Sequence, residues 1–140
     1  MFLPDINVWI GLSFDSHLHH PSSLAWWKST RDEVAAFNRM TQQGYFRLGT
    51  DRRVIGPRAF NMTEAWQTYD DFMNDPRITY VQEPVGIDRL WRSLTSTRAY
   101  SHKLWNDAYL AAFAIAGGYE FVTFDQGFRQ FPGLQCTFLQ

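Results

Sequence analysis

The stretch Leu104–Asp125, LWNDAYLAAFAIAGGYEFVTFD, decides the fold class of this chain. Its first part, Leu104–Ala116, is apolar on every side of a helix, and the pair Gly117-Gly118 that follows is typical of a helix C-terminus. Its second part, Glu120–Phe124, has the β-branched and aromatic residues of a strand and ends at Asp125. A helix that is apolar all round has to be covered on more than one side, so this stretch predicts a helix and a strand that both lie in a core.

The remainder of the chain repeats this alternation of short apolar strands and helices. Further strands are expected at 2–3, 34–37, 78–81 and 137–139, and further helices at 6–12, 17–30, 38–48, 63–73 and 87–97, with a long loop at 49–61. Strands that alternate with helices favour a parallel sheet with helices on both faces. We therefore predict α/β architecture, a three-layer α/β/α sandwich in which residues 1–140 form a single domain.

Composition narrows the class of protein further. At 45% hydrophobic and 17% aromatic residues the chain is neither disordered nor of low complexity. The net charge is only −1, but five arginines lie between Arg39 and Arg58 against the single acid Asp51. Such a stretch either attracts phosphates by its local charge or is an ordinary solvated face.

Cysteine usage and the N-terminal residues indicate a compartment. The single Cys136 cannot form an internal disulfide, which fits a reducing environment. The chain opens on Met1-Phe2-Leu3-Pro4, without a basic segment or a long apolar run, so neither a signal peptide nor a membrane span is expected. The sequence predicts a cytoplasmic protein that does not associate with membranes.

Three aspartates lie where they can meet at one edge of the predicted sheet. Asp5 and Asp125 each follow a strand, and Asp107 lies in the first turn of the apolar helix. Ligands of open α/β sheets bind beyond the carboxyl ends of the strands. Three convergent carboxylates stay ionised only beside a cation, and Mg²⁺ or Mn²⁺ prefers oxygen ligands. The individual alternatives are a helix cap at Asp5, a helix-dipole partner at Asp107 and a turn at Asp125.

Four stretches of the chain, in this order, resemble the PIN-domain family, in particular the VapC-type toxins of bacterial toxin–antitoxin pairs. They are Leu3-Pro4-Asp5-Ile6-Asn7-Val8, Thr41-Gln42-Gln43-Gly44-Tyr45-Phe46-Arg47-Leu48, Trp105–Ala114 and Val122-Thr123-Phe124-Asp125-Gln126-Gly127-Phe128. The resemblance implies a magnesium-dependent endoribonuclease that cleaves RNA phosphodiester bonds. It also implies a homodimer and a VapB-type antitoxin that blocks the site.

The same resemblance implies a role for each polar residue of the site. Asp5, Asp107 and Asp125 would be catalytic and would hold Mg²⁺, with Mn²⁺ as a substitute, directly or through water. Asn7 and Thr123 would be polar supports near the metal or the scissile phosphate. Candidate RNA contacts are Arg39, Arg47 and Lys103.

The chain departs from the family pattern at Gln42, where a glutamate is common. The amide oxygen of Gln42 can still accept a hydrogen bond from water or touch a metal, but one negative charge is missing. Glu33, Glu64 or Glu120 could supply that charge, and the sequence does not choose among them. A non-catalytic PIN-like domain that binds RNA or protein, with a weakened metal site, is therefore an alternative function.

The sequence also allows two other kinds of site and one kind of interaction surface. His17, His19 and His20 could bind a transition metal, although no cysteine or spaced histidine completes a zinc set. Asp5-Ile6-Asn7 is similar to the start of phosphatases with a nucleophilic aspartate, but the second acid that they need is missing at Asn7. A group of aromatic residues on expected outer helices either forms an interaction surface or packs in the core: Trp26, Trp27, Trp66, Phe72 and Trp91.

Overall fold

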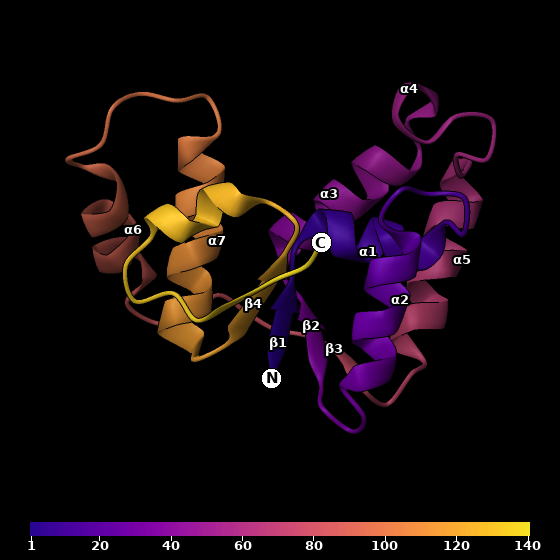
Figure 1. The fold of residues 1–140 in the computed structure, drawn as a ribbon, viewed down its shortest axis with the longest axis horizontal. Helices are drawn as coiled ribbons and strands as arrows, with labels where there is room; N and C mark the ends of the chain where they lie inside the picture. Colours follow the sequence, from indigo (N-terminus) through magenta and orange to yellow (C-terminus); the bar gives the residue numbers. More distant parts are fainter.

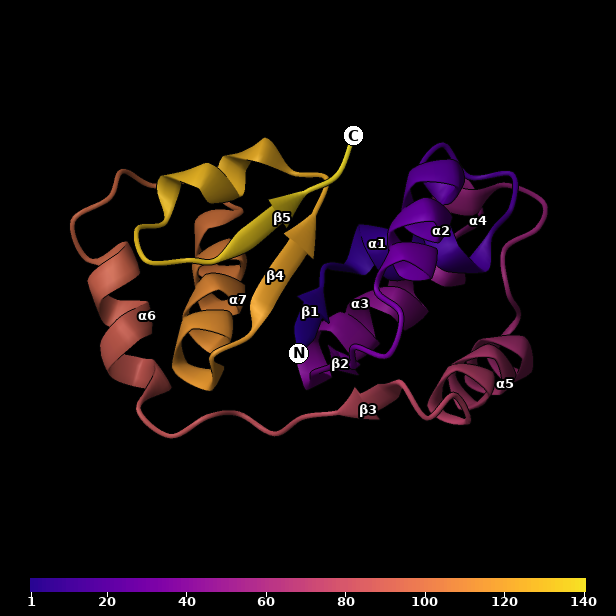
Figure 2. The ribbon, with the colours of Figure 1, turned by 60° about the horizontal axis from the view of Figure 1, so that its bottom comes forward.

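The centre of the protein is a sheet of five strands in the order β3-β2-β1-β4-β5, and every neighbouring pair is parallel. The structure is a computed structural model and describes all residues, 1–140. Figures 1 and 2 show β1 in the middle of the sheet, between β2 and β4. The strands are β1 (Phe2–Pro4), β2 (Ala35–Phe37), β3 (Ile78–Tyr80), β4 (Glu120–Thr123) and β5 (Cys136–Phe138). The predicted parallel sheet is confirmed.

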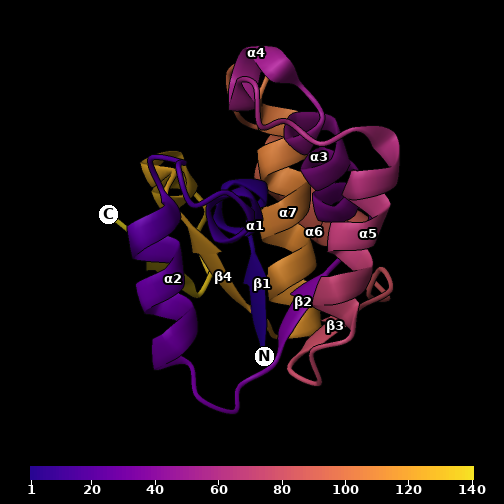
Figure 3. The ribbon, with the colours of Figure 1, turned by 90° about the vertical axis from the view of Figure 1, so that its right-hand side faces the viewer.

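Helices connect the strands. They are α1 (Ile6–Ser13), α2 (His20–Ser29), α3 (Arg39–Gly49), α4 (Arg52–Ile55), α5 (Met62–Met73), α6 (Ile87–Thr95) and α7 (Leu104–Gly117), with the 3₁₀ helix η1 (Gln126–Gln130) between β4 and β5. Figure 3 shows α1 between α2 and α5 when the molecule is seen from the side. No helix is both long and apolar enough to cross a membrane.

Side chains of successive strand residues pack into two separate hydrophobic cores. Leu3 of β1 and Phe121 of β4 pack with α6, α7 and η1. Phe37 of β2 and Val122 of β4 pack instead with residues of α1, α2, α3 and α5. Because successive side chains of a strand point to opposite faces, the two cores lie on the two faces of the sheet. The predicted three-layer α/β/α sandwich is confirmed.

The predicted apolar helix is α7, and its local sequence sets both of its ends. Its small side chains are buried along most of its length, including Ala108, Ala111 and Ala112 at 0% exposure. Gly118 ends the helix in the left-handed region, at φ 69°, which a glycine adopts without a Cβ clash. The chain then turns directly into β4, so the first turn of α7 and the last residue of β4 lie at the same edge of the sheet.

Two local elements differ from the expectations. The stretch 49–61, expected as a loop, contains the short helix α4, which Asp51 caps by accepting a hydrogen bond from the Arg53 N–H at 2.9 Å. The helix expected from residue 17 begins only at His20, because the preceding residues form a tight turn. In that turn the His19 N–H donates to Nδ1 of His17 at 3.0 Å, and Pro21 then occupies the first turn of α2.

Candidate active site

Asp5 and Asp125 both lie just beyond the carboxyl ends of central strands. Asp5 caps α1, since its Oδ1 accepts a hydrogen bond from the Ile6 N–H at 2.8 Å. Asp125 follows β4 and caps η1, with Oδ1 accepting from the Gly127 N–H at 2.8 Å. In each case the cap occupies one carboxylate oxygen and leaves the other, Oδ2, for a different partner.

The hydroxyl of Thr123 connects these two aspartates. Thr123 is fully buried at the end of β4, and its Oγ1 donates to Oδ2 of Asp5 at 2.8 Å. The same oxygen accepts a hydrogen bond from the backbone N–H of Asp125 at 3.0 Å. Asp5 is also fixed by its own N–H, which donates to the Val122 carbonyl at 2.8 Å. Thr123 therefore orients the carboxylate of Asp5 and the backbone of Asp125.

The ammonium group of Lys103 connects Asp125 to the third aspartate. Its Nζ lies 2.8 Å from Oδ2 of Asp125 and 4.0 Å from Oδ2 of Asp107. Asp107 and Lys103 are four residues apart at the start of α7, which places their side chains on one side of the helix. Three carboxylates from distant parts of the sequence are thus joined by one hydroxyl and one ammonium group.

A pocket of about 360 Å³ opens beside two of these acids. Asp5 and Asp107 line it together with Gln43 and Arg47 of α3, and the remaining lining residues are Ile6, Met40, His102, Lys103, Asn106 and Leu110. Two acids, a lysine and an arginine are therefore among the residues that line the pocket. It is the only one of the larger pockets that contains any of the three aspartates.

The pKa values of the aspartates reflect this crowding. Burial raises the pKa of Asp5, and the negative charge of Asp125 raises it further. Burial also raises the pKa of Asp107 to about 6, with Asp125 and Asp5 adding to the rise against the opposing effect of Lys103. The hydrogen bond from Lys103 lowers the pKa of Asp125 instead. Burial is thus the largest cause of both raised pKa values, and the charges of the neighbouring aspartates add to it.

The raised pKa of Asp107 predicts a pH-dependent change in stability without added metal. Folding moves this pKa from 3.8 to about 6, so between these values the folded state binds more protons than the unfolded chain. The free energy of unfolding should then fall as pH rises through that range. Asp107→Asn removes this term, so the variant should gain stability relative to the parent between pH 4 and pH 6. Urea denaturation of both proteins at several pH values measures the difference, and a difference that is constant or of opposite sign would contradict it.

The other predicted site residues are placed less centrally. Asn7 is exposed in the first turn of α1 and makes no side-chain hydrogen bond. Gln42 is buried, does not line the pocket, and accepts a hydrogen bond from Nη1 of Arg39 at 2.5 Å. The guanidinium of Arg39 lies 5.1 Å from the centre of the Tyr80 ring, also outside the pocket. Of the three candidate RNA contacts, Arg47 and Lys103 reach the pocket and Arg39 does not.

Sequence reasoning missed Gln43 as a pocket residue and Lys103 as the partner of the acids. Gln43 precedes Gly44, whose missing side chain lets Ile6 pack against α3, and this contact sets which face of α3 meets the pocket. Lys103 did carry a signal, namely its four-residue spacing from Asp107. That spacing is frequent in ordinary surface pairs and therefore does not single out a site.

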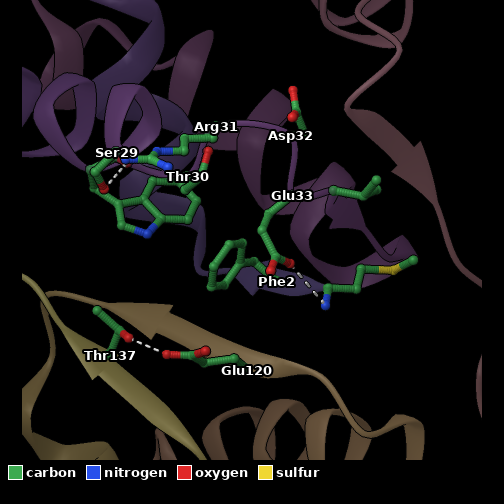
Figure 4. A pocket seen from close by; sticks show the side chains of 11 residues that line it. Phe2, Ser29, Thr30, Arg31, Asp32, Glu33, Glu120 and Thr137 are labelled. Carbon is green, nitrogen blue, oxygen red and sulfur yellow. Dashed lines mark hydrogen bonds and ion pairs between the residues drawn. The ribbon is translucent and has the colours of Figure 1, made fainter.

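A larger pocket, about 880 Å³, lies at the opposite end of the sheet. It is formed by the amino ends of the strands and the connection from α2 to β2, as the labelled residues Phe2, Glu33 and Glu120 in Figure 4 show. Two of its three acids have partners: Glu33 pairs with the N-terminal amine at 3.6 Å, and Glu120 accepts a hydrogen bond from the Thr137 hydroxyl. Glu33 and Glu120, two of the residues considered as sources of the charge missing at Gln42, line this pocket and not the one beside Asp5 and Asp107.

The histidines at the start of α2 have structural partners of their own. Nδ1 of His20 lies 2.7 Å from the Gly11 carbonyl, and the His19 ring stacks on Phe124 at 3.8 Å between ring centres. No three side chains among all the histidines, cysteines, aspartates and glutamates stand close enough together to enclose a metal ion as they are placed. The transition-metal alternative therefore has no support in the structure.

The comparison with known proteins decides the family. The profile of the family described as PIN domain matches residues 2–134. The chain belongs to the PIN-domain family. This PIN-domain protein is similar to Ribonuclease VapC41 of Mycobacterium tuberculosis, with 41% identity over 145 residues and 99% of both chains covered. A second relative from that organism, Ribonuclease VapC44, is 31% identical over 89% of this chain and 85% of its own. The predicted resemblance to VapC-type proteins is confirmed.

Solved structures show the same PIN fold at much lower sequence identity. One chain in the crystal structure of VapBC2 from Rickettsia felis, which is bound to a DNA fragment from the VapBC2 promoter, matches with a TM-score of 0.69 at 14% identity. The match covers 99% of this chain and 98% of that chain. VapC20 of Mycobacterium tuberculosis, a sarcin-ricin loop cleaving toxin, matches with a TM-score of 0.65 at 17% identity over 96% and 99% of the two chains. These matches bear on the fold alone.

Proposed function

We propose that this PIN-domain protein is a Mg²⁺-dependent endoribonuclease and the toxin of a VapBC-type pair. The observation that carries the proposal is the joining of Asp5, Asp107 and Asp125 through Thr123 and Lys103 at one end of the sheet. The names of the VapC ribonuclease relatives support the same activity. The cytoplasm, where RNA is available, is the compartment that we propose.

The chemistry of these side chains fits a hard divalent cation. The ligand atoms that Asp5, Asp107 and Asp125 offer are carboxylate oxygens, the ligand type that Mg²⁺ and Mn²⁺ prefer. Burial is the main cause of the raised pKa of Asp107, and the charges of Asp125 and Asp5, which add to it, are ones that a divalent cation would compensate. Asp5, Asp107 and Asp125 would hold the ion, directly or through water, and Thr123 would keep Asp5 oriented toward it.

The bound ion would polarise the phosphodiester and lower the pKa of an attacking water. The protein side chains have separate tasks around that reaction. Asp107, which lines the pocket beside Asp5, would orient or deprotonate that water as an ionised carboxylate. Arg47 lines the pocket from α3 and would bind an RNA phosphate, holding the scissile bond against the acids.

The partners that we propose are a VapB-type antitoxin and a second copy of the chain. Of the aromatic residues considered for an interaction surface, only Trp66 is largely exposed, at 54%, while Trp26 is buried at 8%. Trp66 and the exposed Met62 (73%) are four residues apart and therefore lie on one side of α5. Such a group of apolar side chains supports a protein-binding role for this region.

The proposed function is tested by RNA cleavage with controlled metal. Purified protein should cleave unstructured and structured RNA in the presence of Mg²⁺ or Mn²⁺, and excess chelator should reduce the rate to the uncatalysed level. Restoring Mg²⁺ should restore cleavage, because metal removal leaves the fold intact. RNA binding without cleavage under all metal conditions would favour the alternative, a non-catalytic PIN-like domain.

The position of Gln42 bears on that alternative. The alternative assumed that an amide in place of glutamate weakens the metal site. Gln42 instead accepts a hydrogen bond from Arg39 and does not line the pocket, whereas its neighbour Gln43 does. A missing charge at residue 42 therefore gives little reason to expect a lost activity.

A further inference from the structure

We propose that Lys103 and the divalent cation exchange at this site. Without metal, the ammonium group of Lys103 compensates the charges of Asp125 and Asp107. When the cation binds, Lys103 leaves the acids and its ammonium group turns to the RNA phosphate at the mouth of the pocket. This inference rests on the proposed function and adds to it the step by which the site changes from metal-free to substrate-ready.

The ammonium group of Lys103 pairs with carboxylate oxygens that would otherwise bind the metal. Its Nζ is 2.8 Å from Oδ2 of Asp125, the oxygen that the cap of η1 leaves free, and 4.0 Å from Oδ2 of Asp107. No other cationic side chain forms an ion pair with any of the three aspartates. Since the three acids do not enclose an ion as they are placed, they have to close in around one, and Lys103 lies between two of them.

Lys103 lies at the N-terminus of α7, where its ammonium group needs nearby carboxylates to hold it. Lys103 is the N-cap residue of α7 and makes no side-chain capping hydrogen bond. The N-terminus of a helix carries partial positive charge, so a cation is disfavoured there unless nearby anions hold it. A divalent cation bound to Asp107 and Asp125 would remove that attraction and add repulsion between two positive groups.

The surroundings of Lys103 allow it to move. Its side chain is 55% exposed, and the residues from Ser96 to Lys103 lie outside the helices and strands. A lysine side chain has a flexible four-carbon stem, so its ammonium group can leave one partner without a backbone change. Arg47 and His102 line the same pocket, so a released Lys103 would join a group of cationic or protonatable side chains facing the substrate.

Metal titration tests the exchange without measuring catalysis. Titration calorimetry with Mn²⁺, and with Mg²⁺ alone, should show that Lys103→Gln binds the ion about 3- to 10-fold more tightly than the parent, in line with loss of one partly exposed charge-assisted pair. Lys28→Gln is the matched control, since Lys28 is the chain's only other lysine and lies exposed on α2. It should leave the affinity unchanged.

Lysine labelling provides a second readout on the parent protein, without any substitution. Brief acetylation followed by peptide mass spectrometry gives the ratio of modified Lys103 to modified Lys28. Saturating Mn²⁺ should raise this ratio several-fold, because Lys103 loses its partners. An unchanged or lower ratio would overturn the exchange.

The two proposals fail in distinguishable ways. If the parent and Lys103→Gln bind Mn²⁺ with equal affinity, or the variant binds more weakly, the exchange is overturned while the metal-dependent function stands. If neither protein binds Mn²⁺ or Mg²⁺, both the exchange and the proposed metal-dependent cleavage are overturned.

Discussion

Asp5→Asn should lower Mg²⁺-dependent RNA cleavage by more than about 100-fold while the protein remains folded. Replacing a residue that only supports a metal ligand lowers metal affinity or activity by about 10- to 100-fold. Asp5 is proposed as a ligand itself, so its replacement should have a larger effect. Asparagine caps a helix as well as aspartate, so α1 should still begin at Ile6. The substitution also removes a buried carboxylate with a raised pKa, so the metal-free melting temperature should stay equal or rise.

The matched control for this prediction is Asp51→Asn. Asp51 is likewise a helix N-cap aspartate, that of α4, but it pairs with Arg53 and lies outside the pocket. Cleavage rates of the three proteins, measured on one RNA with Mg²⁺, should be the same for the parent and the control. Parent-like cleavage by Asp5→Asn would remove Asp5 from the mechanism.

Phe37→Ala should destabilise the fold by about 3–5 kcal/mol, the usual cost of removing a buried phenyl ring. Phe37 is fully buried at the end of β2 and stacks on Trp9 at 3.9 Å between ring centres. It also makes an edge contact with Tyr45 at 5.9 Å and with Tyr69 at 5.1 Å. Since this ring joins α1, α3 and α5 to the sheet, its loss leaves a cavity that no single neighbour can fill.

Tyr100→Ala is the control for that core substitution, because Tyr100 is 86% exposed. It should change the free energy of unfolding by less than about 0.5 kcal/mol. Urea denaturation of the parent and both variants gives the two differences. A loss below about 1 kcal/mol for Phe37→Ala would contradict the core that the structure describes.

Much of the site followed from the sequence because the strand ends are easy to recognise. Asp5 and Asp125 come directly after apolar runs, and in a parallel sheet all such ends lie at one edge. Asp107 could be placed with them because it begins the helix that leads into β4. Thr123 was expected as a support only from the resemblance to the PIN-domain family, and in the structure its hydroxyl has hydrogen bonds with Asp5 and Asp125.

The remaining features depend on details that local sequence does not specify. Residues 42 and 43 are about 100° apart around α3, and the packing of this helix, which includes the close approach of Ile6 to Gly44, determines which of them meets the pocket. The helix α4 is too short for any hydrophobic period to reveal it. The pairing of Lys103 with Asp125 joins residues 22 apart, which no local pattern specifies.

The most direct test of the shared metal site is a crystal structure of the protein soaked with Mn²⁺, read from the anomalous difference map. We predict one strong peak among the carboxylates of Asp5, Asp107 and Asp125, within about 2.0–2.2 Å of at least one of their oxygens. The other aspartates should reach the ion directly or through one water. A Mn²⁺ peak away from all three aspartates, in protein that still cleaves RNA, would contradict the account.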